Sequence, residues 1–178
     1  SDVCSSDLDD IAAVAAALRD AFLTTGPRVS EFERRTAEWV GCRDVVAVNS
    51  GTAALHAAYA AAGVEAGTEI ITSPLTFAST ANAALFLRAE VRFADVDPAT
   101  GLLDPSSVEA LITSRTRAIV PVDYAGVPAP YERFARYREQ GIAIIGDSAH
   151  SLGATLHGRP VGTLSDAATV SLHPVKTM

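Results

Sequence analysis

Short apolar runs that alternate with helix-forming stretches constrain this chain more than any other feature. The runs are apolar at successive positions and are bounded by turn residues, as in strands buried on both faces. Helical stretches such as residues 51–63 and 131–141 separate most of them. This order predicts βαβ units and an α/β fold with a mainly parallel sheet covered on both sides. The expected strands lie in DVVAVNS, EIITSP, AEVRFADV, RAIVPVDY and GIAIIGDS, and a last one precedes SLHPVK.

Two helices are predicted before the first of these runs. Apolar residues recur at helical spacing over residues 11–22, which indicates an amphipathic helix. A second helix is predicted to begin at Ser30, with Glu33 completing a capping box, and to end at Gly41.

Composition narrows the class of protein. A chain of 178 residues with 48% hydrophobic content can bury the core of one domain, and a net charge of -7 argues against nucleic-acid partners. No apolar run reaches the roughly 18 residues that span a bilayer, so we expect no membrane segment. Cys4 and Cys42 form no paired framework, which favours a reducing compartment. We therefore expect a cytoplasmic protein.

Polar residues gather directly after the expected strands. In open α/β sheets the ligand binds at the carboxyl ends of the strands, so these positions are the candidates for a site. They are Ser50, Gly51, Thr52, Thr76, Phe77, Asp95, Asp97, Asp123, Tyr124, Asp147 and His150.

The string VNSGTAALHAA joins a strand to an alanine-rich helix through Ser50, Gly51 and Thr52. Free backbone N–H groups and two hydroxyls would meet there, which suits a phosphate, although a simply capped helix has the same residue types. A helix terminus contributes only about 0.3–2 kcal/mol toward holding an anion. A ligand bound here must therefore be anchored by other groups as well. Neither GxxxxGK[ST] nor GxGxxG occurs, which argues against common nucleotide loops.

Two further residues admit both a functional and a structural interpretation. Asp147 ends a nearly all-apolar strand, where it is either a helix N-cap or the counter-ion of a buried protonated nitrogen. Lys176 is either a surface lysine or, in a desolvated site, a nucleophilic amine. A metal site of Asp147, His150 and His157 has only weak support from spacing.

Together these features call for pyridoxal 5'-phosphate, and the strings LTTGP, NSGTAALHAA, SPLTFASTANA, GDSAHSLGA and SLHPVK resemble the DegT/DnrJ/EryC1/StrS sugar aminotransferases. The resemblance extends from about residue 9 to the end of the chain. It implies the three-layer α/β large domain of the aspartate-aminotransferase-like fold, truncated. Residues 1–8 are expected to be a non-native or disordered leader, and residues 9–178 the N-terminal half of the cofactor-binding domain.

The resemblance also implies roles for individual residues. Lys176 would bind the cofactor covalently and move protons, and Asp147 would pair with the ring nitrogen. Phe77 would lie against the ring face, and His150 would support the phenolic oxygen.

The phosphate of the cofactor would be held by a separate group of residues. On the resemblance these are Thr52, the backbone of Gly51, Thr52 and Ala53, and Ser171. No metal is implied.

The implied reaction moves an amino group from L-glutamate to a nucleotide-linked keto-sugar in a homodimeric enzyme. The strings are most similar to the subgroup of UDP-4-amino-4,6-dideoxy-N-acetyl-altrosamine transaminases, which aminate C4 of UDP-4-keto-6-deoxy-N-acetylhexosamines. We expect this chain alone to be inactive, since family members continue well past the lysine. Alternatives are another fold-related pyridoxal-phosphate enzyme, of desulfurase or aldolase type, and a non-catalytic α/β binding module.

Overall fold

The computed structural model describes residues 8–176. The chain divides between Ala47 and Val48 into two compact units. Of the predicted leader, residues 1–7 lie outside the described residues, and Leu8 begins the first helix.

The first unit contains two helices, α1 (Leu8–Ala17) and α2 (Pro27–Val40). Helix α1 ends earlier than predicted. The predicted start of the second helix is wrong, because α2 begins at Pro27 behind Gly26 rather than at Ser30. Proline suits the first turn of a helix, where its missing N–H is not needed. The predicted end is confirmed, since Gly41 closes α2 in the left-handed conformation at φ 76°.

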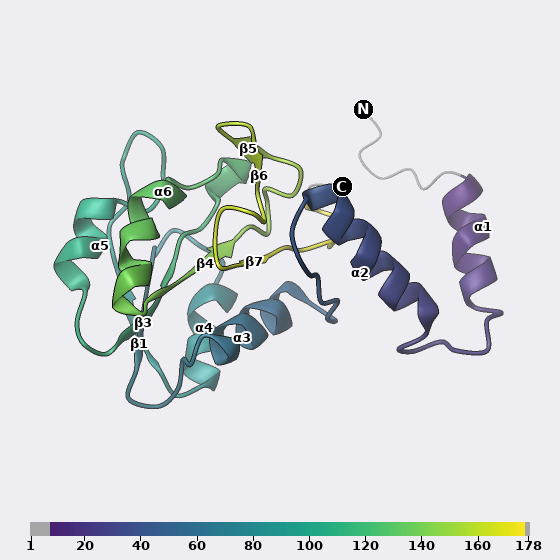
Figure 1. The fold of residues 1–178 in the computed structure, drawn as a ribbon, viewed down its shortest axis with the longest axis horizontal. Coiled ribbons are helices and arrows are strands. Elements are labelled where there is room, and N and C mark those ends of the chain that lie inside the picture. The colour runs from purple at the N-terminus through teal and green to yellow at the C-terminus, as the bar shows by residue number, and fades with distance from the viewer. Residues whose placement is uncertain (1–7, 177–178) are drawn as a thin grey trace. The chain divides into compact units, whose positions relative to one another are not determined.

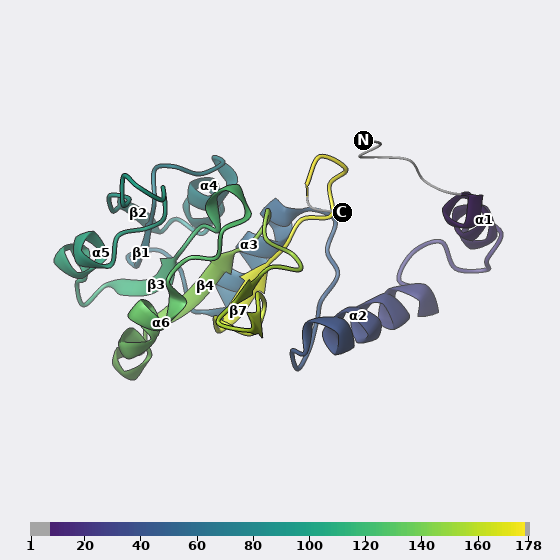
Figure 2. The same cartoon turned by 90° about the horizontal axis from the view of Figure 1, so that it is seen from above.

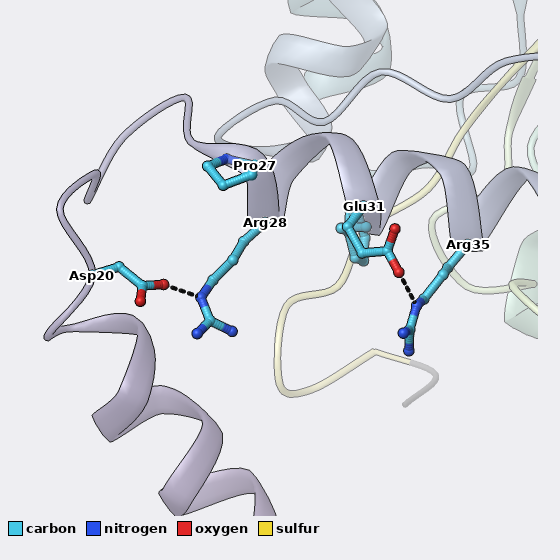
Figure 3. Close-up of a pocket in the computed structure, with 6 residues that line it drawn as sticks. Asp20, Pro27, Arg28, Glu31 and Arg35 are labelled. Carbon is cyan, nitrogen blue, oxygen red and sulfur yellow. Dashed lines mark hydrogen bonds and ion pairs between the residues drawn. The ribbon is translucent and has the colours of Figure 1, made fainter.

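A hollow of about 530 Å³ lies beside the start of α2 (Figure 3). Arg28 forms an ion pair with Asp20, and Arg35 forms one with Glu31. All four side chains are well exposed, so each pair contributes only about 0–1 kcal/mol to stability. Both arginines are already paired with carboxylates, so this hollow is a weak candidate for an anion site.

The second unit is built on five parallel strands in the order β2-β1-β3-β4-β7 (Figures 1 and 2). The strands are β1 (Glu69–Thr72), β2 (Glu90–Phe93), β3 (Thr116–Val120), β4 (Ala143–Asp147) and β7 (Ala167–Thr169). A separate hairpin pairs β5 (Thr155–Leu156) with β6 (Arg159–Pro160). The prediction of an α/β fold with a mainly parallel sheet is confirmed.

Helices cover both faces of this sheet, as Figures 1 and 2 show. One side carries α3 and α4, and the other carries α5 and the helical segment formed by α6 and η2. A 3₁₀ turn, η1, follows β3. Their bounds are α3 (Gly51–Ala61), α4 (Ser79–Phe86), α5 (Pro105–Leu111), η1 (Tyr124–Gly126), α6 (Tyr131–Phe134) and η2 (Ala135–Gln140).

Successive strand residues belong to different cores, because side chains of a strand alternate between its faces. Ile70 and Ile145 lie in the core under α3 and α4, together with Tyr59 of α3. Ile71 and Ile144 lie in the core under α5 and α6. This double burial is why the strands read as continuous apolar runs in the sequence.

Residues 44–50 were predicted to form a strand, and this prediction is wrong. No strand partner pairs with them within residues 8–176, and Val46 and Val48 are exposed. The N–H of Ala47 instead donates to the Glu33 carboxylate at 2.8 Å. Glu33 thus stabilises this segment rather than the start of α2. A run of apolar residues becomes a strand only where a neighbour supplies the hydrogen bonds.

Membrane insertion and metal binding find no structural support in the described part of the chain. No helix there is long and apolar enough to cross a bilayer. Among the same residues, no group of three or more His, Cys, Asp or Glu side chains could hold a metal ion. The weakly supported metal site of Asp147, His150 and His157 therefore does not form.

Candidate active site

Two buried carboxylates, those of Asp123 and Asp147, lie at the carboxyl ends of neighbouring strands and face opposite sides of the sheet. Asp147 is two residues beyond Ile145, so it shares the face covered by α3 and α4. Asp123 instead contacts Tyr131 of α6, on the other face. Strand alternation therefore separates the two carboxylates although their backbones are hydrogen bonded.

Asp123 is fully engaged by protein donors. Its two oxygens accept from the Ala129 N–H and from the hydroxyls of Tyr131, Ser148 and Ser151, at 2.5–2.9 Å. Burial and the charge of Asp123 raise the pKa of the Tyr131 phenol, which keeps that group a donor. Asp123 is therefore a structural carboxylate that joins the segments after β3 and β4.

Asp147 is also buried but has fewer partners. Its Oδ2 accepts from the Thr80 hydroxyl at 2.6 Å, and its Oδ1 accepts weakly from the Ala149 N–H at 3.4 Å. Burial raises the pKa of the Asp147 carboxyl, the Thr80 hydrogen bond lowers it, and the nearby charge of Asp123 raises it. The predicted alternative, a helix N-cap, is wrong because residues 148–154 form turns. Asp147 thus retains acceptor capacity for a cationic partner.

The start of α3 lies close to Ser171. A Cβ placed on Gly51 would come within 3.5 Å of the Ser171 Cβ and 3.8 Å of its Oγ. Ser50 caps the helix, because its Oγ accepts from the Ala53 N–H at 3.1 Å. The first N–H groups of a helix have no partner within it, so those of Gly51 and Thr52 can donate to a ligand. The predicted cap is therefore present, and the N–H groups of Gly51 and Thr52 lie beside Ser171.

Lys176 lies directly against His150. The distance between Lys176 Nζ and His150 Nε2 is 2.5 Å. Both residues, with Ala125 and Val175, line a hollow of about 340 Å³. Ala125 belongs to η1, where Gly126 adopts a φ of 85° and passes the His150 carbonyl, which a Cβ would approach to 3.0 Å. Residues from three strand ends therefore meet around the lysine.

Phe77 follows β1 and projects into solvent with 75% of its surface exposed. Its carbonyl accepts from the Thr80 N–H at 3.1 Å, which fixes it at the start of α4. An exposed aromatic ring on an anchored turn can receive the face of a flat ligand. The structure thus supplies an aromatic surface near the residue that holds Asp147.

Other strand-end candidates serve the fold rather than this site. The carboxylate of Asp97 caps a turn by accepting from the Ala99 N–H at 2.7 Å, and the Asp95 N–H donates to Ser107. The sequence interpretation missed Thr80, which contacts Asp147 directly. A signal was present, since Thr80, Ala83 and Ala84 share one buried helical face.

The donor set fits pyridoxal 5'-phosphate. Asp147 offers a buried acceptor for a protonated ring nitrogen, and Lys176 offers an amine for its aldehyde. The α3 terminus and Ser171 offer donors for a phosphate. These groups match the three chemical features of that cofactor.

Comparison with known proteins agrees with this chemistry. Residues 5–178 match the DegT/DnrJ/EryC1/StrS aminotransferase family. The chain is 39% identical over 171 residues to the spore coat polysaccharide biosynthesis protein SpsC of Bacillus subtilis, covering 96% of this chain and 44% of SpsC. The chain therefore spans less than half of this curated relative.

Solved structures of similar proteins share the fold. The PLP form of the putative sugar aminotransferase Spr1654 from Streptococcus pneumoniae superposes with a TM-score of 0.92 at 30% identity, over 97% of this chain and 48% of that one. DesI, solved with its TDP-sugar product, gives a TM-score of 0.86 at 39% identity, over 93% and 42% of the two chains. The predicted family, mainly parallel α/β fold and cofactor are confirmed by these matches.

Proposed function

Because this chain belongs to the DegT/DnrJ/EryC1/StrS aminotransferase family, we propose that it forms part of an enzyme that transfers an amino group from L-glutamate to a nucleotide-linked keto-sugar. The observation that carries this proposal is the buried Asp147 carboxylate, which has acceptor capacity to spare at the edge of the sheet where Lys176 meets His150. A buried carboxylate with a raised pKa is stabilised by a cationic ligand.

The central roles fall to Lys176 and Asp147. When bound, pyridoxal 5'-phosphate supplies an electron sink for the reaction. Lys176 attaches the cofactor through its amine and acts as general acid and base in both halves of the reaction. Asp147 accepts a hydrogen bond from the ring nitrogen and keeps that nitrogen protonated. His150, in contact with Lys176, supports the phenolic oxygen.

The phosphate and the ring face are held by other residues. The N–H groups of Gly51 and Thr52, the Thr52 hydroxyl and Ser171 bind the phosphate. Ala53 contributes once its N–H leaves the Ser50 cap. The exposed Phe77 would lie against the ring of a bound cofactor and would exclude water from one face.

The sugar substrate is proposed at two levels of detail. A nucleotide-linked sugar is favoured by the similarity to DesI, which was solved with its TDP-sugar product. The more specific proposal is C4 of a UDP-4-keto-6-deoxy-N-acetylhexosamine, supported by the strings SPLTFASTANAA, PVDYAGVP and HPVK. The two proposals can be told apart by assaying amino transfer to a UDP-linked and to a dTDP-linked sugar.

We also propose a cytoplasmic homodimer acting in polysaccharide biosynthesis, in line with the name of SpsC. The chain covers 44% of the length of SpsC. Activity is therefore to be tested in the full-length protein.

Covalent labelling tests the assignment of Lys176, which is the only lysine among these 178 residues. Full-length protein is incubated with pyridoxal 5'-phosphate, reduced with borohydride and digested. We expect the cofactor mass on the peptide that contains Lys176, and no visible cofactor absorbance in Lys176→Ala. Arg159→Ala, which removes a surface cation, is the control. An unlabelled Lys176 peptide from protein that binds the cofactor would reject the assignment.

The substrate is tested by following amino transfer from L-glutamate to matched UDP-linked and dTDP-linked 4-keto-6-deoxy sugars. We expect turnover with the UDP-N-acetylhexosamine. Turnover with only the dTDP sugar would retain the sugar aminotransferase and reject the specific substrate. Release of sulfide or cleavage of a carbon–carbon bond, without amino transfer, would favour the alternative enzyme types.

A further inference from the structure

Three side chains form a continuous hydrogen-bonded chain that ends at Asp147. Thr76 Oγ1 lies 2.7 Å from Thr80 Oγ1, which lies 2.6 Å from Asp147 Oδ2. Thr80 is fully buried, and Asp147 is 6% exposed. The chain runs from the turn beside Phe77, through the first turn of α4, to the end of β4.

The direction of these hydrogen bonds follows from the chemistry of the groups. An ionised carboxylate only accepts, so the single hydroxyl proton of Thr80 goes to Asp147. Thr80 must then accept from Thr76, whose hydroxyl becomes the donor. The length of the Thr80 to Asp147 contact lies in the range of charge-assisted O–H···O⁻ bonds. All three groups are therefore oriented in one direction, toward the carboxylate.

Thr80 is itself held in place from a neighbouring helix. The buried hydroxyl of Tyr59, in α3, donates to the Thr80 carbonyl at 2.9 Å. Burial raises the pKa of the Tyr59 phenol, so this group stays protonated and remains a donor. The hydroxyl of Thr80 is thus presented from a fixed backbone. Preorganised donors of this kind hold the groups that contact a ligand.

We propose that Thr80 is a positioning residue for Asp147, with Thr76 as the donor behind it. The pair holds Oδ2 so that Oδ1 remains the oxygen available to the ring nitrogen of the cofactor. This inference rests on the proposed function, since it assigns the partner of Asp147. It adds two residues to the site on the evidence of their contacts alone.

A purely structural role for the Thr80 hydroxyl makes a different prediction. Thr72 provides the comparison, because its hydroxyl is equally buried and donates to the Val120 carbonyl at 2.8 Å. Valine at Thr72 removes one buried hydrogen bond and valine at Thr80 removes two, and both substitutions keep the shape of the side chain. Only the loss at Thr80 should reach the cofactor.

The test uses the full-length holoprotein and its Thr80→Val, Thr80→Ser, Thr76→Val and Thr72→Val variants. The affinity for pyridoxal 5'-phosphate is titrated by absorbance, and the ¹⁵N shift of labelled cofactor reports protonation of the ring nitrogen. We expect Thr80→Val to weaken affinity about tenfold or more and to shift the ring nitrogen toward its unprotonated position. Thr80→Ser should stay within about twofold, because it keeps the hydroxyl.

The remaining variants decide between the interpretations. Thr76→Val should change the nitrogen shift in the same direction by a smaller amount, since it removes only the outer donor. Thr72→Val should lower the melting temperature and leave both cofactor readouts unchanged. If Thr80→Val fails to fold, an unchanged nitrogen shift in Thr76→Val overturns the proposal.

The same measurements distinguish a failure of the proposed function from a failure of the role of Thr80. Wild-type protein that binds no cofactor would reject the function itself. Wild-type protein that binds the cofactor, together with a Thr80→Val variant of equal affinity and equal nitrogen shift, would reject the role of Thr80 alone.

Discussion

The N–H of Asp123 donates to the Asp147 carbonyl at 3.0 Å, yet the side chains of these two residues have opposite surroundings. Asp123 accepts four hydrogen bonds, and Asp147 accepts one short and one long one. Two carboxylates at adjacent strand ends thus differ in how many hydrogen bonds the protein donates to them. Asp123 is complete without a ligand, and Asp147 is not.

We predict that Asp147→Asn stabilises the apoprotein near neutral pH and abolishes tight cofactor binding. Burial is the largest effect on the pKa of Asp147 and the charge of His150 offsets only part of it, so removing the charge of Asp147 should raise the free energy of unfolding by about 0.5–2 kcal/mol. Cofactor affinity should fall by about 100-fold or more, because an amide carries no negative charge to pair with the protonated ring nitrogen. Urea denaturation and absorbance titration measure the two effects.

The effect of Asp147→Asn on stability should depend on pH. Since burial raises the pKa of Asp147 in the folded state, its ionisation lowers stability as pH rises from about 4, the unfolded value, through the folded pKa. The stability advantage of Asp147→Asn should therefore be absent at lower pH and grow to a plateau above that window. An advantage that shrinks with rising pH would contradict the raised pKa.

Asp123→Asn is predicted to destabilise the protein by about 2–4 kcal/mol. The amide would place N–H groups against donors that now converge on a carboxylate, among them Tyr131 and Ser151. Asp97→Asn is the matched control, because Asn caps an exposed turn as well as Asp does, and it should stay within about 0.5 kcal/mol. Equal effects at the two positions in urea denaturation would contradict this account.

Gly146→Ala is predicted to cost about 1–3 kcal/mol through overpacking. The added Cβ would lie 2.5 Å from the Tyr131 hydroxyl oxygen and 3.1 Å from the Ser148 Oγ. In a Tyr131→Phe background, which lacks that oxygen, the same substitution should cost at least about 1 kcal/mol less. A double-mutant cycle of unfolding free energies makes the measurement, and strict additivity would argue against the contact.

Gly51→Ala is predicted to leave stability nearly unchanged and to weaken cofactor binding about tenfold or more. The new Cβ makes only ordinary contact with Ser171, so the fold accommodates it. It would, however, occupy space between the two groups proposed to hold the phosphate. Thermal unfolding of the apoprotein and cofactor titration separate the effects. Affinity equal to that of wild type would place the phosphate elsewhere.

The sequence predicts most of the sheet because the central strands β1, β3 and β4 are mostly buried and therefore largely apolar. It fails at residues 44–50, where the apolar run finds no pairing strand within residues 8–176. Helix α4 was not predicted, because Ser, Thr and Asn dominate its first turns and are poor helix formers. Segment 131–141 was predicted as one helix, and its second half winds as 3₁₀. In these three segments, tertiary contacts determine the secondary structure.

Some residues of the candidate site can also be predicted from the sequence, and others cannot. Asp147 can be found from the sequence, because a carboxylate at the end of an apolar strand requires a partner. Asp123 looks the same in the sequence, and only the hydroxyls of Tyr131, Ser148 and Ser151 show that it is satisfied. Thr80 is 67 positions from Asp147, and no local pattern connects them. Long-range contacts of this kind come from the fold alone.

The alternation of side chains along β4 makes the site sensitive to insertions and deletions. One residue added or lost between Ile145 and Asp147 would turn the carboxylate toward α6 and leave Gly146 or Ser148 facing Thr80. A change of length within β4 therefore moves the carboxylate to the other face of the sheet, whereas a change in the turns after it leaves Asp147 in place.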